Sequence, residues 1–151
     1  MSNHAISFSV AGIPVGKGSM KAFMPRGGKF PIVTHDSAKS KPWASLVSLT
    51  ARQYAENTGW QIVNSGSVEV ELKFAMPRPN GHYGTGKNAD VLKESAPVLH
   101  TSKPDIDKLT RLVLDALTGI LWKDDNQVAS LRVTKFYSNT GTTGVTISCS
   151  P

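Results

Sequence analysis

Apolar and polar residues alternate with a period of two in three segments of the chain, which is the pattern of a half-buried β-strand. These segments are residues 5–10, 67–76 and 128–137. In 67–76 (SVEVELKFAM), valine, leucine and phenylalanine fall on one side and glutamate and lysine on the other. We therefore expect this strand to have one face in water. A fourth apolar segment, 145–149, follows a turn-rich stretch, so we expect it to form a closing hairpin with 128–137.

Two other segments repeat their apolar residues every three or four positions, as an amphipathic helix does. The first begins near Pro42 and ends before Gly59, and we expect its Trp43 and Tyr54 to lie in the core. The second lies between the strands 67–76 and 128–137. The elements then follow the order β-α-β-α-β-β, which predicts a single α+β domain spanning residues 1–151.

The second helical segment, residues 104–119 (PDIDKLTRLVLDALTG), opens with proline and two aspartates and stops at a glycine, which are helix start and stop signals. Its polar arc carries Asp107, Arg111 and Asp115 at i, i+4 and i+8, so acid, base and acid form one stripe. Leu114 falls on the same polar side. It is a candidate subunit contact.

Composition narrows the class of protein. The chain of 151 residues has 17 Lys and Arg, 11 Asp and Glu and one cysteine, Cys149. This length supports a core without disulfide or metal staples, which excludes collagen-like, disulfide-rich and fully disordered classes. The lone cysteine, the lack of a membrane-length apolar run and an N-terminus unlike a signal peptide predict a cytoplasmic protein. The net charge of +6 favours an anionic partner, nucleic acid ahead of an acidic membrane surface, with simple solubility as the alternative.

Much of the positive charge lies in two glycine- and proline-rich stretches, residues 12–41 and 77–103. We expect the first to be a flexible loop with a short extended piece at 29–34, and the second to be a long loop with a helical turn near 90–94. Both suit contact with phosphates, although each is also compatible with an ordinary solvated loop. The basic residues are Lys17, Lys21, Arg26, Lys29, Lys39 and Lys41 in the first, and Arg78, Lys87, Lys93 and Lys103 in the second. The second loop also carries His82 and His100, which are either metal ligands or solvated side chains.

Carboxylates gather at 103–128, an acidic motif. The five are Asp105, Asp107, Asp115, Asp124 and Asp125. Carboxylates that converge on one point suit a hard cation such as Mg²⁺, which activates water at a phosphodiester. This requires residues 121–126 to run back beside the helix to its N-terminal end. The alternative assigns the same residues to helix capping, a surface ion ladder and a turn.

Three blocks of this motif, Lys103–Leu109 (KPDIDKL), Asp115–Gly119 (DALTG) and Trp122–Val128 (WKDDNQV), closely resemble the signature of the RusA family of Holliday junction resolvases. The match is dense over about 26 residues. The resemblance implies a RusA-like fold with a mixed four-stranded sheet and two main helices. It also implies a homodimeric, Mg²⁺-dependent endonuclease, of phage or prophage origin, that nicks four-way DNA junctions symmetrically.

Carried over by position, the family's catalytic and metal-binding carboxylates fall on Asp105, Asp107 and Asp125, with Asp124 as a further acidic position. The family's catalytic lysine is Arg111 here, which keeps the charge and can clamp a phosphate but cannot donate a proton. Lys108, on nearly the same face, is a substitute. The resemblance leaves Asp115 a structural role. The residues expected to contact DNA are Lys17, Lys21, Arg26, Lys29, Arg78, Lys103 and Lys108.

Two other functions remain as alternatives. A non-catalytic protein that binds branched DNA would use the acidic residues structurally. A restriction-type nuclease would use Pro104–Asp105 with the Glu71-Leu72-Lys73 element, but their order along the chain is the reverse of the order usual in such nucleases.

The apolar run 120–122 is either a dimer contact or part of the protomer's own core.

Overall fold

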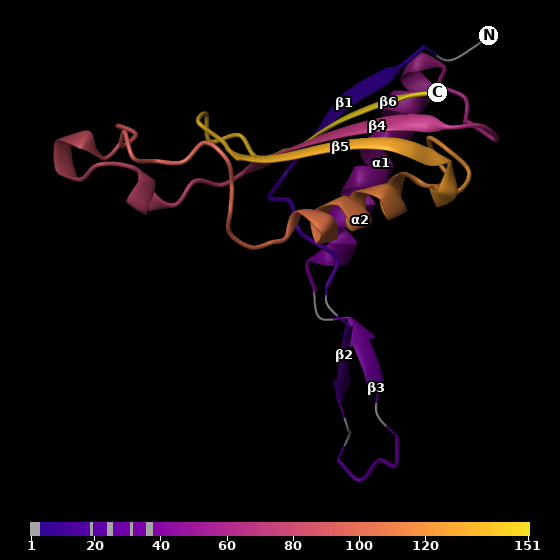
Figure 1. Ribbon diagram of the computed structural model, residues 1–151, viewed down its shortest axis with the longest axis horizontal. Helices are drawn as coiled ribbons and strands as arrows, with labels where there is room; N and C mark the ends of the chain where they lie inside the picture. The colour runs from indigo at the N-terminus through magenta and orange to yellow at the C-terminus, as the bar shows by residue number, and fades with distance from the viewer. Residues whose placement is uncertain (1–3, 19, 24–25, 31, 36–37) are drawn as a thin grey trace.

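The computed structural model describes residues 4–18, 20–23, 26–30, 32–35 and 38–151. Its main sheet contains β1 (Ile6–Ala11), β6 (Gly144–Ser150), β4 (Val68–Met76) and β5 (Val128–Tyr137), in that order across the sheet. β4 and β5 are parallel, whereas β6 is antiparallel to both of its neighbours. The predicted α+β domain with a mixed four-stranded sheet is therefore confirmed (Figure 1).

The predicted hairpin between the last two strands is wrong, because β6 lies between β1 and β4 and not beside β5. A period of two determines which face of a strand is buried, but it does not determine the neighbouring strand. In β6, Val145, Ile147 and Cys149 are buried on the helical side. Burial raises the pKa of the Cys149 thiol to about 12, so this cysteine behaves as a core residue.

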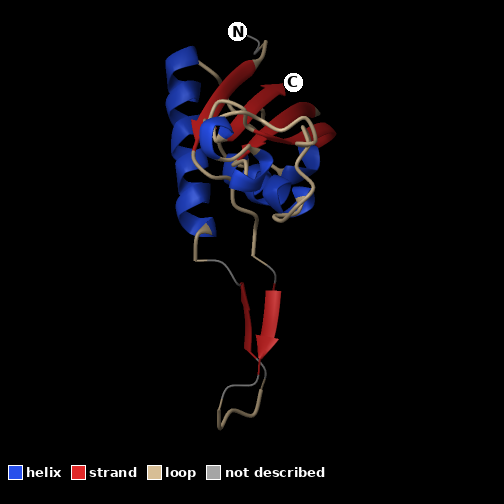
Figure 2. Ribbon diagram, turned by 90° about the vertical axis from the view of Figure 1, so that its left-hand side faces the viewer, coloured by secondary structure: helices blue, strands red, loops and turns tan. Residues whose placement is uncertain are grey.

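Helices α1 (Ser40–Thr58) and α2 (Ile106–Leu117) cover one face of the sheet (Figures 1 and 2). Their apolar stripes form the core with the inner face of the sheet, as the periodicity predicted. Trp43 of α1 is 5% exposed, whereas Tyr54 is 41% exposed, so the prediction that Tyr54 lies in the core is wrong. Its ring stacks on Phe8 at the edge of the core, with ring centroids 5.2 Å apart.

The chain turns sharply after α2. Gly119 has φ +88°, a left-handed conformation that favours glycine, and its N–H donates to the carbonyl of Trp122. Leu121 and Trp122 are completely buried, so they belong to the protomer's core and not to a dimer contact. Val63, from the segment between α1 and β4, exchanges backbone hydrogen bonds with Leu121 and Lys123. A short 3-10 turn, η3 (Asp125–Gln127), then leads into β5.

Two segments extend from this body (Figure 1). β2 (Met20–Phe23) and β3 (Ile32–His35) form an antiparallel hairpin where a flexible loop was predicted, and only the extended piece at 29–34 was anticipated. In residues 77–103 the helical turns are η1 (Asn80–His82) and η2 (Gly86–Asn88), so the predicted turn near 90–94 is misplaced. The proline and glycine content of both stretches obscured these short elements.

The end of the long loop is fastened to β5. The N–H of His100 donates to the carbonyl of Lys135 at 3.0 Å, and the N–H of Tyr137 donates to the carbonyl of Val98 at 2.9 Å. In the part of the chain that the structure describes, no helix is long and apolar enough to span a membrane.

Candidate active site

A groove of about 440 Å³ runs along the polar face of α2, between this helix and β5. Asp107, Arg111 and Asp115 all line it, so the predicted stripe of acid, base and acid is confirmed. Asp125 enters from the segment after α2. The remaining lining residues are mostly apolar: Ile106, Thr110, Leu114, Leu131 and Val133. Three carboxylates and one guanidinium therefore border an otherwise apolar groove.

At the N-terminal end of α2, the backbone is held from β5. The Lys135 ammonium donates to the carbonyl of Ser102 at 2.7 Å and to the carbonyl of Pro104 at 2.9 Å. Asp105 follows immediately as the residue before the helix, and its carboxylate lies 3.9 Å from the Lys108 ammonium. A negative charge is favourable at this end of a helix, because the first N–H groups are unpaired there. Asp105 lies outside the lining of the groove.

Asp107 and Arg111 differ from these anchored groups. Both are exposed, and neither side chain forms a hydrogen bond or ion pair with another described residue. Asp107 lies in the first turn of α2, and Arg111 lies one turn later on the same face. A carboxylate and a guanidinium that have no partners in the described part of the chain are available to a cation and to a phosphate respectively.

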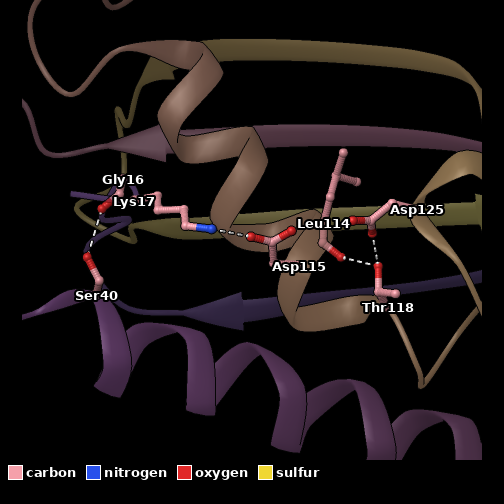
Figure 3. Close-up of polar contacts among 7 residues, drawn as sticks. All are labelled: Gly16, Lys17, Ser40, Leu114, Asp115, Thr118 and Asp125. Atoms are coloured by element: carbon pink, nitrogen blue, oxygen red, sulfur yellow. Dashed lines mark hydrogen bonds and ion pairs between the residues drawn. The ribbon is translucent and has the colours of Figure 1, made fainter. Parts of the chain in front are cut away.

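At the C-terminal end of α2, the side chain of Asp125 is held by the protein (Figure 3). The Thr118 hydroxyl forms a hydrogen bond with Asp125 Oδ1, and the indole N–H of Trp122 donates to the same hydroxyl at 3.0 Å. This end is therefore stabilised by side-chain contacts with a buried aromatic residue.

Gln127 fixes the turn that carries the acidic residues. Its Oε1 accepts hydrogen bonds from the N–H groups of Lys123 and Asp124, at 2.9 and 2.8 Å. Its Nε2 donates to the carbonyls of Val63 and Gly66, at 2.9 and 3.1 Å. One amide thus closes the turn and attaches it to the segment before β4. Asp124 is exposed beside this turn and does not line the groove.

Asp107 and Asp125 lie toward opposite ends of the groove. Asp125 contacts Thr118, eleven residues after Asp107, and a rise of 1.5 Å per residue corresponds to about 16 Å along the helix. A site shared within one chain required residues 121–126 to run back to the N-terminal end of the helix. This condition is not met, because buried Leu121 and Trp122 keep the chain at the C-terminal end. Among the described residues, no three His, Cys, Asp or Glu side chains are grouped so that they could hold a metal ion.

Several predicted DNA contacts already interact within the protein. The Lys17 ammonium lies 2.8 Å from Asp115, and the Lys17 N–H donates to the carbonyl of Lys108 at 3.0 Å (Figure 3). Ser40 donates to the carbonyl of Gly16 at 2.9 Å, which joins this loop to the start of α1. These contacts agree with a structural role for Asp115. Arg26, Lys29 and Lys103 are exposed, while the side chain of Lys21 lies outside the described residues.

Arg78 also has internal partners. Its guanidinium donates to the carbonyl of Pro97 and to Asn139 Oδ1, both at 2.8 Å, and it lies over the Tyr137 ring. His82 and His100 pack their rings against the same tyrosine. His100 is 8% exposed, so the expectation of a solvated histidine is wrong for this residue. Burial and, to a smaller extent, the charge of Lys135 lower the pKa of His100.

Sequence reasoning did not identify Thr118, Gln127 or Lys135 as residues that shape the site. Thr118 and Gln127 stand inside the motif blocks, at the end of DALTG and within DDNQ, so their place beside the aspartates was the available signal. Lys135 belongs to an alternating strand and gave no signal, because its contacts join residues 31 and 33 positions apart.

Comparison with known proteins is consistent with this geometry. The family described as "Endodeoxyribonuclease RusA" matches residues 12–148. "Uncharacterized protein YqaN" of Bacillus subtilis (strain 168) is 35% identical over 133 residues, which cover 88% of this chain and 88% of that protein.

Proposed function

Because this chain belongs to the RusA family of endodeoxyribonucleases, we propose that it resolves four-way DNA junctions by Mg²⁺-dependent, paired nicking of opposed strands. The observation that carries the proposal is a pair of side chains on α2 that have no partner among the described residues. Asp107 and Arg111 present a carboxylate and a guanidinium in one groove, which Asp125 also borders. Cleavage of a phosphodiester needs carboxylates that hold a metal ion and a positive group that stabilises the charge of the transition state.

Carboxylates offer only oxygen ligands, which a hard cation prefers. Because Asp107 and Asp125 of one chain lie about 16 Å apart along α2, Asp105 and Asp107 of one copy and Asp125 of a second copy would hold the Mg²⁺ ion, with Asp124 as an additional carboxylate. When bound, Mg²⁺ activates water and stabilises the leaving oxygen. The planar guanidinium of Arg111 presents a fork of N–H donors, so its role is to bind the scissile phosphate in two places and not to donate a proton.

The separation of Asp107 and Asp125 supports a homodimer. Between them the groove is apolar, and Ile106 and Leu131 are 39% and 45% exposed. If two copies pack these grooves together about a two-fold axis perpendicular to α2, their α2 helices run antiparallel. Asp125 of a second copy then approaches Asp107 of the first, and each of two equivalent sites draws carboxylates from both chains. Leu114, which also lines the groove, becomes a subunit contact.

Two equivalent sites match the substrate, because a four-way junction presents two equivalent, opposed strands to be cut. Exposed Arg26 and Lys29, between β2 and β3, together with Lys103 and the net charge of +6, supply positive charge for the junction arms. Lys17, Lys21, Arg78 and Lys108 remain part of the proposed DNA surface. Lys17 would contact DNA while also pairing with Asp115 of the groove, and Lys108 would do so while lying beside Asp105.

The test is incubation of a labelled synthetic four-way junction with and without Mg²⁺, with a linear duplex of the same sequence alongside. We expect paired, symmetric incisions in the junction only when Mg²⁺ is present. Junction binding that is equal with and without Mg²⁺, with no incision, would instead support a non-catalytic protein that binds branched DNA. Light scattering on the same preparation measures the proposed dimer, and a monomer that cuts would refute the shared site.

A further inference from the structure

We propose that Thr118 and Trp122 are positioning residues that orient the Asp125 carboxylate for the cation. This inference rests on the proposed function, since it assigns supporting partners to one of the proposed ligands. The three side chains form a continuous series from the core to the groove. Trp122 is completely buried, Thr118 is half-buried, and Asp125 is exposed. Figure 3 shows the contact between Thr118 and Asp125.

The series begins with a donor that has one acceptor. The indole N–H of Trp122 has no access to water, and the Thr118 hydroxyl oxygen lies 3.0 Å away as its partner. Buried N–H groups are almost always paired, so this contact fixes the position of the hydroxyl oxygen. The indole also occupies one of the two acceptor sites of that oxygen.

The single hydroxyl proton of Thr118 then has two neighbouring acceptors. These are Asp125 Oδ1 and the carbonyl of Leu114, which lies 2.8 Å from the hydroxyl oxygen. The Leu114 carbonyl already accepts the backbone N–H of Thr118 at 3.0 Å. A carboxylate oxygen is a stronger acceptor than a peptide carbonyl, and the Leu114 carbonyl already has a donor in the backbone N–H. The hydroxyl proton of Thr118 is therefore donated to Asp125.

The consequence concerns the exposed side chain of Asp125. Held through Oδ1, the carboxylate loses much of its rotational freedom, and Oδ2 has no partner among the described residues. Partners behind a ligand commonly set its orientation and change metal affinity by about 10- to 100-fold. Thr118 thus supplies the orientation, and Trp122 fixes Thr118.

The test compares T118V, which replaces the hydroxyl by a methyl group, with T118S, which keeps it. The first readout is Mn²⁺ binding to the DNA-free protein, followed by electron paramagnetic resonance. We expect T118V to bind Mn²⁺ about 10- to 100-fold more weakly, while T118S stays within about threefold of the unaltered protein. The second readout is the Mg²⁺ concentration for half-maximal junction cleavage, which should rise in T118V, with junction affinity in EDTA unchanged.

Two further variants separate orientation from helix stability. T50V removes a hydroxyl that donates to the carbonyl four residues earlier in α1, as Thr118 does in α2, but that has no carboxylate partner among the described residues. We expect it to bind Mn²⁺ normally. W122F removes the indole N–H and should weaken Mn²⁺ binding less than T118V does, with thermal melting recorded to exclude unfolding.

The outcomes distinguish the two proposals. If the unaltered protein cuts junctions and T118V matches it in Mn²⁺ affinity and Mg²⁺ requirement, the positioning role is wrong while the proposed function stands. Equal weakening in T118V and T118S would show that packing matters and the hydroxyl does not, which also overturns the inference. If the unaltered protein never cuts, the proposed function fails, and Mn²⁺ binding still measures whether Thr118 orients Asp125.

Discussion

The two ends of α2 are built differently. At the C-terminal end a side chain is held, since Asp125 is hydrogen-bonded to Thr118, which also accepts a hydrogen bond from buried Trp122. At the N-terminal end the backbone is held, since Lys135 binds two carbonyls around Pro104 while the side chain of Asp107 has no described partner. The C-terminal end therefore orders the carboxylate of Asp125, whereas the N-terminal end orders the backbone that carries Asp107 and leaves its side chain without a partner among the described residues.

This difference bears on the proposed function. If Asp125 binds the cation as proposed, its carboxylate is already ordered before the cation arrives, which favours one position for the ion. Asp107, which has no partner among the described residues, could then adjust when DNA or a second copy of the chain covers the groove. The predictions below test this contrast, beginning with the largest expected effect.

Removing either carboxylate should abolish cleavage. We expect D107N and D125N each to lower the junction cleavage rate at least about 100-fold, because each loses a charged metal ligand. Junction affinity in EDTA should stay within about twofold, since the basic surface is unchanged. D90N, in an exposed part of the long loop, is the matched control. Normal cleavage by D107N or D125N would remove that residue from the site.

Arg111 should affect the chemical step more than binding. We expect R111A to slow single-turnover cleavage about 100-fold, as loss of one group that stabilises transition-state charge does, with a much smaller loss of junction affinity. R111K restores the residue type usual in the family and should recover most of the rate. If R111A lowers affinity alone, Arg111 is a phosphate anchor and takes no part in the chemical step.

Loosening the backbone at the N-terminal end of α2 should lower the cleavage rate moderately. We expect K135M to lower cleavage about tenfold, because the carbonyls of Ser102 and Pro104 lose their donor and Asp105 and Asp107 lose their fixed starting point. R132M is the control on the same strand, since the Arg132 side chain is 81% exposed. Mn²⁺ affinity should fall in K135M and not in R132M. Equal behaviour of the two variants would show that the backbone at this end is fixed without Lys135.

Acid should loosen the N-terminal end only slightly. Burial, with a smaller contribution from Lys135, lowers the pKa of His100 below its ordinary value near 6.5. The unfolded chain therefore binds more protons than the folded chain between that lowered pKa and 6.5. Stability should fall as the pH drops through this window and should be fully present above it. Denaturant unfolding of the unaltered protein and of H100Q measures this, and an equal pH dependence in both would refute it.

The sequence predicted the parts of this fold that depend on local pattern. Both helices, the strand 67–76 and the stripe of Asp107, Arg111 and Asp115 follow from periodicity, and the structure confirms them. The motif also predicted that Asp107 and Asp125 belong to one site, and the structure places both on one groove. Their assignment to catalysis remains a prediction.

What the sequence did not predict depends on contacts between distant residues. β6 lies between β1 and β4 and forms backbone hydrogen bonds with both, although β1 is at the other end of the chain. A local pattern of apolar residues does not predict such a pairing. The same holds for the bonds from Lys135 to Ser102 and Pro104. The return of residues 121–126 was misplaced because burial of Trp122, a tertiary effect, determines where the chain goes.

The attachment of Gln127 to Val63 and Gly66 has a practical consequence for protein engineering. The segment between α1 and β4 is distant from the acidic motif in sequence, yet its carbonyls accept the hydrogen bonds that hold Gln127 of that motif in place. A change of length at 63–66 would therefore disturb the site even though no motif residue is altered. The loop near Lys87 differs, because its carbonyls at residues 85, 86 and 88 accept hydrogen bonds from N–H groups of the same loop.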